Sequence, residues 1–352
     1  MSVTFLLPAA TALLALIFCL ALLDQWRERR HAFQLVWAAG MLFFALAAAS
    51  EAAAALGGWN ELLYKTWYLT GAVYTAGWLG LGTAFLLGRT RFGYAFAVCL
   101  FLAGLFTLLT WQKFPDVYGA AGQGPAVLYF LAAGVLAVSV AVETYFQDEK
   151  WPRLAAVAVI GASALGLVLT LTATIPAPGY ALDPTTHLPT GDLFPPSLRL
   201  LTPFMNVTGA FALILGAIFS VYVFMPKKRV LAYSLDPEQP FDQFLFNLLI
   251  SPVAILVNFV ASIPGALRAF SAGRINSRVP ATVLIAIGAF IPSMGDTLDR
   301  FGDTAWFDLF KFLGVVFLFL GFLVSVEVFQ EVRIPFTHVV LRGGRREPHS
   351  LP

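Results

Sequence analysis

Apolar residues gather along this chain in long runs, and polar residues fall mainly between the runs. A helix needs roughly 20 apolar residues to cross the hydrocarbon layer of a membrane, and nine uninterrupted runs come close to that length. We expect transmembrane helices at 3–23, 32–56, 62–88, 94–111, 124–147, 153–175, 203–225, 279–297 and 307–330. The pattern therefore predicts an all-α polytopic integral membrane protein with nine transmembrane helices.

Residues 244–270 form a further apolar run, which Asn247, Pro252, Asn258 and Pro264 interrupt. Each proline removes a helix hydrogen bond. Basic residues concentrate on the cytoplasmic side of membrane proteins, so the count of Lys and Arg distinguishes two arrangements. If the run does not cross, 17 of the 22 basic residues are cytoplasmic; if it crosses, the split is 12 against 10. We therefore expect a Pro-broken re-entrant or interfacial helical hairpin on the cytoplasmic side.

This arrangement divides the chain into four parts. Residues 1–229 form a seven-helix bundle with its N-terminus outside, and 230–278 form a cytoplasmic-side linker and the hairpin. Residues 279–330 form a two-helix transmembrane hairpin, and 331–352 form a basic cytoplasmic tail. The first seven helices are similar in topology to microbial rhodopsins and to the heptahelical sensor regions of bacterial histidine kinases. A retinal Schiff base needs a lysine in the seventh span, and 203–225 contains none.

Composition supports a membrane location and narrows the function. Charged residues make up 12% of the chain and hydrophobic residues 59%, with a mean hydropathy of +0.79. Soluble domains carry roughly 25% charged residues, so we expect no soluble catalytic domain and no nucleic-acid partner.

The segment LYKTWYLTGAVYTAGWLGLGTAFLL resembles stretches of bacterial membrane proteins, which implies a bacterial cytoplasmic membrane. Cys19 and Cys99 lie inside apolar runs, so we expect neither a disulfide nor a cysteine metal site.

The first candidate site lies near the outer ends of the second and third spans. Glu51 and Lys65 flank a short loop, so their side chains could form an ion pair or a ligand site open to the outside. Trp67, Tyr74 and Trp78 recur at helical spacing on one face of the third span. This stripe is consistent with a pocket for a pigment, quinone or lipid, and also with a packing seam whose glycines admit a neighbouring helix.

The second candidate site is the polar lining of the predicted hairpin. Its residues are Asn247, Ser251, Asn258 and Ser262. Apolar segments interrupted by proline are typical of substrate sites in transporters. A transporter or channel that uses 244–270 as its gate or substrate site is therefore the alternative to a binding function.

The sequence offers few residues that could bind a haem or a metal ion. The four histidines, His31, His187, His338 and His349, lie outside the predicted spans, so a membrane haem would lack its usual ligands. The outer loop places Asp183, His187 and Asp192 within ten residues, a spacing more typical of a solvated loop than of a metal site. We therefore expect a non-enzymatic membrane protein without metal or cofactor, acting as a sensor, as a binder of lipid or a small ligand, or as a subunit of a membrane complex. Its expected partners are membrane lipids and other membrane subunits or further copies of the chain.

Overall fold

The structure is a computed structural model that describes residues 3–146, 150–175, 193–276, 278–300, 306–325, 332–333, 335–337 and 340–342. Its elements run in the order α1 (Val3–Arg29), α2 (Ala32–Gly57), α3 (Glu61–Trp67), η1 (Tyr68–Tyr74), α4 (Thr75–Leu86), α5 (Phe92–Lys113), α6 (Pro115–Tyr118), η2 (Ala120–Gly122), α7 (Gln123–Tyr145), α8 (Trp151–Thr172), α9 (Pro196–Phe224), α10 (Phe241–Ser271), α11 (Arg278–Arg300), α12 (Phe307–Val324), β1 (Val332–Arg333) and β2 (Val340–Arg342). The two short strands pair antiparallel. The described part of the chain is thus almost entirely helical.

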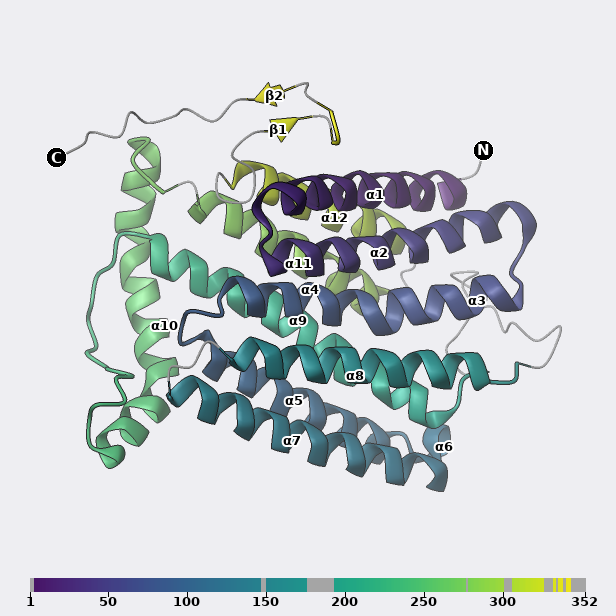
Figure 1. Ribbon diagram of the computed structural model, residues 1–352, viewed down its shortest axis with the longest axis horizontal. Helices are drawn as coiled ribbons and strands as arrows, with labels where there is room; N and C mark the ends of the chain where they lie inside the picture. Colours follow the sequence, from purple (N-terminus) through teal and green to yellow (C-terminus); the bar gives the residue numbers. More distant parts are fainter. Residues whose placement is uncertain are drawn as a thin grey trace.

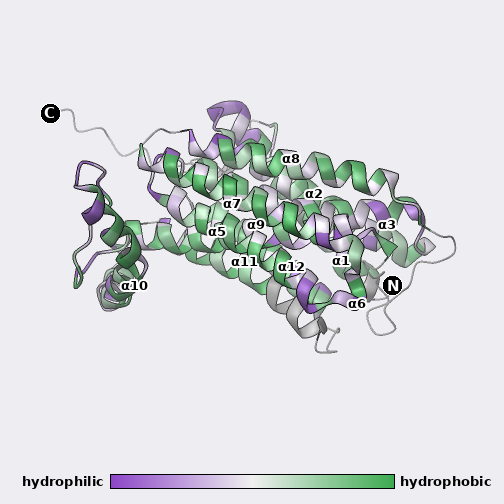
Figure 2. Cartoon of the chain, turned by 90° about the horizontal axis from the view of Figure 1, so that it is seen from below, coloured by the Kyte–Doolittle hydropathy of each residue, from purple (hydrophilic) through white to green (hydrophobic). Residues whose placement is uncertain are grey.

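The long helices other than α10 lie side by side and form one bundle (Figure 1). Within the described residues, nine helices are long and apolar enough to cross a membrane. This set includes α10 but not α11, of which only Arg278–Pro292 counts as a shorter apolar helix. Each of the nine runs expected from the sequence lies largely within helix. Hydrophobic residues predominate along the bundle, and hydrophilic residues gather in the connections at its ends (Figure 2).

The buried hydrophobic residues of the bundle form two main clusters, which lie among different sets of helices. One cluster joins α3, α4, α5, α7, α8 and α9, with Tyr64, Phe96 and Trp151 among its most buried members. The other joins α1 and α2 to α11 and α12 and includes Phe18 and Trp37. Helices α2, α4 and α9 lie between the clusters, so the interface among these three helices unites the two halves.

Glycines bring α4 and α9 into backbone contact. A Cβ added to Gly209 on α9 would lie 2.0 Å from the carbonyl oxygen of Ala76, and one added to Gly80 would lie 2.6 Å from Gly209 Cα. Gly82 gives similar room to the indole of Trp37. Side chains at these positions would separate the helices, which confirms the packing seam that the sequence predicts for this span.

The hairpin shape expected for 244–270 is wrong, because α10 is one continuous helix of 31 residues that contains Pro252 and Pro264. An interfacial position on the cytoplasmic side stays a prediction. A proline at 252 cannot donate a backbone hydrogen bond to the carbonyl of Leu248. The hydroxyl of Ser251 donates to that carbonyl instead, at 2.9 Å, and so compensates the break. Helix α10 runs across one end of the bundle, transverse to the other helices (Figure 1).

Candidate functional site

Glu51 on α2 is the centre of a buried charged cluster. Its side chain is 7% exposed, and Lys311 Nζ on α12 lies 2.6 Å from Glu51 Oε2. Trp67 Nε1 donates a hydrogen bond to the other carboxylate oxygen, Oε1, also at 2.6 Å. Lys311 Nζ lies 2.9 Å from Asp308 Oδ1 and 4.2 Å from the centre of the Phe307 ring. Both oxygens of Glu51 are therefore bound by donors from two different helices.

The pairing of Glu51 with Lys65 that the sequence suggests is wrong. Lys65 pairs at 2.7 Å with Glu61, which lies one turn earlier on α3 and is 54% exposed. Residues four apart on a helix face each other, so Lys65 finds a carboxylate on its own helix. Glu51 pairs instead with Lys311 on α12, which is 260 residues away in the chain.

The aromatic stripe expected on the third span is split by a π-helical segment. Residues Tyr68–Tyr74 form this segment between α3 and α4. A π-helical turn contains an extra residue and so rotates the later turns of a helix relative to the earlier ones; such turns are frequent at functional sites. Trp67, before the turn, reaches Glu51, whereas Tyr74 and Trp78 face α8.

Tyr74 and Trp78 belong to a packing contact. The Tyr74 hydroxyl donates to the carbonyl oxygen of Ser163 at 2.9 Å, and Trp78 Nε1 donates to Ser163 Oγ at 3.0 Å. Phe43 on α2 contacts both rings, with centroid distances of 4.8 and 5.5 Å. These two aromatic residues therefore stabilise the α4–α8 contact, while Trp67 alone of the stripe joins the charged cluster.

A cavity of about 320 Å³ extends from the charged cluster into the bundle. Helices α2, α9, α11 and α12 and the segment from Trp67 to Leu79 surround it. Small residues dominate its wall, and their short side chains leave the space open. The lining residues are Phe44, Ala47, Ala48, Glu51, Trp67, Gly71, Ala72, Thr75, Ala76, Leu79, Asn206, Gly209, Ala210, Leu213, Gly288, Ala289, Pro292, Phe307, Lys311 and Leu318.

Asn206 on α9 adds a polar group to this largely apolar wall. Its side-chain amide makes no hydrogen bond with the described residues, whereas the neighbouring Thr75 hydroxyl donates to the carbonyl of Thr70 at 2.7 Å. An amide offers both donors and an acceptor. Small-molecule sites of roughly 300–1,000 Å³ combine an apolar wall with a few polar groups of this kind, and the cavity has both features.

The polar residues of α10 bind the chain itself. Asn258 Oδ1 accepts hydrogen bonds from the backbone N–H groups of Val230 and Leu231 at 2.7 and 2.9 Å, and its Nδ2 donates to the Leu231 carbonyl. Ser262 Oγ accepts from the Lys228 N–H at 2.8 Å. Asn247 Nδ2 donates to Gln239 Oε1 at 2.9 Å, and the Ser251 hydroxyl bonds within α10. These side chains hold the connection between α9 and α10 against the helix.

Glu51 and Trp67, which the sequence named as candidates, lie together in the charged cluster. Sequence reasoning did not name Lys311 and Asp308, which join this cluster, or Asn206, which lines the adjoining cavity. The sequence did hold a signal for Lys311 and Asp308, because both are charged residues that lie within the first turns of the apolar run 307–330. Among the described residues, no group of three or more His, Cys, Asp or Glu side chains is arranged to hold a metal ion. The loop with Asp183, His187 and Asp192 lies outside the described residues.

The chain matches no protein-family model, and comparison with curated proteins and with solved structures finds no relative.

Proposed function

We propose that this chain is an integral membrane protein that binds an uncharged lipophilic molecule in the cavity beside Glu51 and Lys311. The observation that carries the proposal is the combination of an apolar cavity of about 320 Å³ with polar groups at defined places on its wall. Ionisable residues inside membrane helices are costly and mark functional sites by default. The cavity opens the packed bundle at the level of this charged cluster.

The charges of the cluster define the chemistry of the ligand. Glu51 and Asp308 carry two negative charges against one positive charge on Lys311, and Lys311 contacts both carboxylates. An anionic ligand would therefore meet two carboxylates whose cation is already engaged. A carbonyl or hydroxyl group can instead bond the amide of Asn206, while the apolar body of the ligand contacts the alanines and glycines of the wall. Lipophilic carbonyl compounds and lipid alcohols have this chemistry.

The placement of the ionisable side chains favours binding over catalysis. Glu51 and Lys311 are the ionisable side chains that line the cavity, and each is bonded to the other rather than directed at the open space. A sensor that responds to a small lipophilic molecule needs a binding site of this kind. We place the protein in a bacterial cytoplasmic membrane. The excess of basic residues on one side, counted with 244–270 not crossing, supports an N-terminus outside and a C-terminus in the cytoplasm.

Binding can be tested on protein purified in mild detergent. We expect native mass spectrometry and solvent extraction to recover a neutral lipophilic molecule from the full chain. Ala210→Phe places a ring in the cavity and should abolish this binding, whereas Ala132→Phe on the exposed face of α7 should not. Asn206→Leu removes a hydrogen bond of about 0.5–1.5 kcal/mol and should weaken binding roughly twofold to twelvefold. Recovery of the same molecule from wild type and Ala210→Phe would refute the proposal.

Transport through α10 is the competing function. The side chains of Asn247 and Asn258 form hydrogen bonds with other residues of the chain. This pairing argues against a role for them in lining a path for solute. Flux into liposomes that is lost in Asn247→Ala and Asn258→Ala would favour transport over binding.

A further inference from the structure

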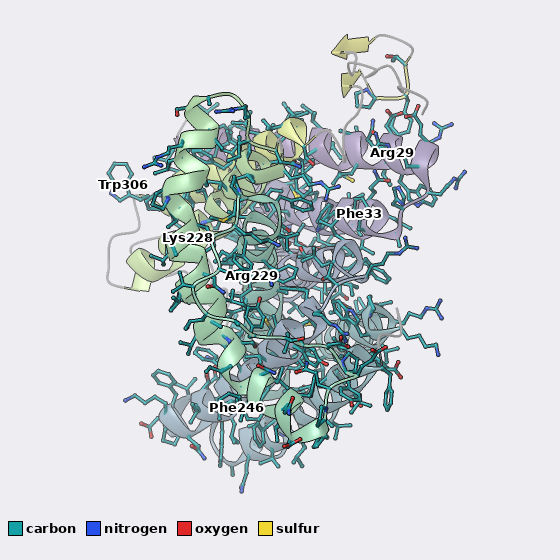
Figure 3. The ribbon with its side chains drawn as sticks, turned by 90° about the vertical axis from the view of Figure 1, so that its left-hand side faces the viewer. Arg29, Phe33, Lys228, Arg229, Phe246 and Trp306 are labelled. Atoms are coloured by element: carbon teal, nitrogen blue, oxygen red, sulfur yellow. The ribbon has the colours of Figure 1, made fainter. Side chains whose placement is uncertain are left out.

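Helix α10 differs from the other long helices in its direction and position. It crosses the end of the bundle at which α1 ends and α2 begins, and the other long helices run toward or away from that end (Figure 1). Viewed from this end, α10 passes in front of the bundle, with Lys228 and Arg229 beside its middle and Phe246 on its lower half (Figure 3). A helix of 31 residues is about 46 Å long. In this direction its whole length lies along the plane of a membrane that the bundle would span.

One side of α10 is apolar and uncovered. The residues at helical spacing on this side are exposed by 44–72%: Leu245, Leu249, Val253, Leu256, Val260 and Leu267. No charged side chain interrupts this row between Leu245 and Leu267. Contact of this apolar arc with water would be unfavourable in free energy, because removing each CH₂ group from water stabilises a protein by about 0.8 kcal/mol. The surface therefore requires an apolar neighbour.

The opposite side of α10 is polar and covered by the chain that precedes it. Asn258 and Ser262 on this side bond the backbone of Lys228, Val230 and Leu231. The connection itself follows α10 on the side away from the bundle (Figure 1). Its residues 226–232 are exposed. Three layers result, with an apolar surface, then the helix, then a polar segment.

Five basic residues lie beside this element, and three acidic residues, Asp236, Glu238 and Asp242, lie in the connection and the first turn of α10. Lys227, Lys228 and Arg229 lie in the exposed segment, and Arg268 and Arg274 lie exposed at the C-terminal end of α10. Five cations beside an apolar arc match the boundary between the acyl chains and the headgroups of a membrane that contains anionic lipid.

We infer that α10 is an in-plane membrane anchor whose apolar arc lies among the acyl chains of the cytoplasmic leaflet, and whose flanking basic residues bind anionic phospholipid headgroups. The partner is a lipid surface, which fits the transverse direction, the order of the layers and the charge. This inference is independent of the ligand cavity, which lies at the opposite end of α2.

The depth of α10 can be measured with a matched pair of labelled variants. Val253, on the apolar arc, and Val230, in the polar segment, are 56% and 55% exposed in the structure. Each is replaced by cysteine in a full chain whose buried Cys19 and Cys99 are replaced by alanine, and is labelled with an environment-sensitive fluorophore. The protein is reconstituted in vesicles of phosphatidylcholine, alone or mixed with phosphatidylglycerol.

We expect the Val253→Cys label to be quenched by lipids spin-labelled on their acyl chains and to be shielded from iodide. The Val230→Cys label should show the reverse. Equal access of iodide to both labels would overturn the inference. Shielding of Val253→Cys from both quenchers, together with cross-linking between copies through this position, would also overturn it, because a second chain would then cover the arc.

The headgroup contact is tested by replacing Lys227, Lys228 and Arg229 together with glutamine. Each basic side chain near an anionic surface contributes about a fivefold factor in affinity. We therefore expect the variant to retain phosphatidylglycerol at least about tenfold less tightly during detergent washing. Lys113→Gln, at the opposite end of the bundle, should leave this retention unchanged. Equal retention by the triple variant and wild type would overturn the anionic-lipid contact.

Discussion

Replacing Lys311 with methionine keeps the length of the side chain and removes its charge. Lys311 Nζ lies 2.6 Å from Glu51 Oε2 and 2.9 Å from Asp308 Oδ1 in the structure. Loss of one partner of a buried ion pair costs about 3–5 kcal/mol, because the remaining charge stays buried without compensation. We expect Lys311→Met to lower the free energy of unfolding by about this amount.

Lys65→Met is the matched control for this change. The side chains of Lys65 and Lys311 are both 16% exposed, but Glu61, the partner of Lys65, is 54% exposed, whereas Glu51 is 7% exposed. A pair of this type on a helix surface contributes about 0.3–0.5 kcal/mol. The free energy of unfolding can be measured by circular dichroism while sodium dodecyl sulfate is added to protein in mild detergent. Equal losses in the two variants would refute the reasoning.

A double variant separates the pair from the individual side chains. Glu51→Gln combined with Lys311→Met leaves no uncompensated charge between these two positions, and removing both partners of a buried pair costs far less than removing one. We expect the double variant to be more stable than the sum of the two single changes predicts. Strict additivity would show that Glu51 and Lys311 do not stabilise each other.

Three further predictions concern other parts of the fold. Gly209→Ala places a Cβ 2.0 Å from a backbone oxygen of α4 and should cost about 1–3 kcal/mol in the same titration, whereas Gly134→Ala, with open space around it, should not destabilise the protein. Asn258→Ala removes three hydrogen bonds to the segment before α10 and should speed amide hydrogen exchange there, an effect that Asn247→Ala should not reproduce. Burial, and then the neighbouring tyrosine of α9, raise the pKa of Tyr233 to about 12. Its contribution to stability should thus be complete below pH 10 and be lost as the pH rises toward 12, and an ultraviolet titration of wild type minus Tyr233→Phe would detect the shift.

The sequence alone predicted an almost entirely helical chain and the positions of its long apolar helices, and the structure confirms both. Runs of apolar residues must become helices if lipid surrounds them, because a helix satisfies its backbone hydrogen bonds internally. The glycines of the third span likewise predicted a close helix contact, which the structure realises at Gly80 and Gly209. These properties depend on residues that are neighbours in sequence or one turn apart, so a linear pattern is sufficient to reveal them.

The tertiary structure decided which residues form the site. Glu51 meets Lys311, which is 260 residues away in the chain, and the cavity exists only where five separate segments of the bundle come together. The π-helical turn at Tyr68–Tyr74 shifted the register and separated Trp67 from the aromatic residues that share its sequence period. Helix α10 continues through Pro252, where the Ser251 hydroxyl bonds the Leu248 carbonyl, and through Pro264. Hydropathy and helical period describe each helix by itself, whereas ion pairs, cavities and the direction of α10 depend on how the helices pack against one another.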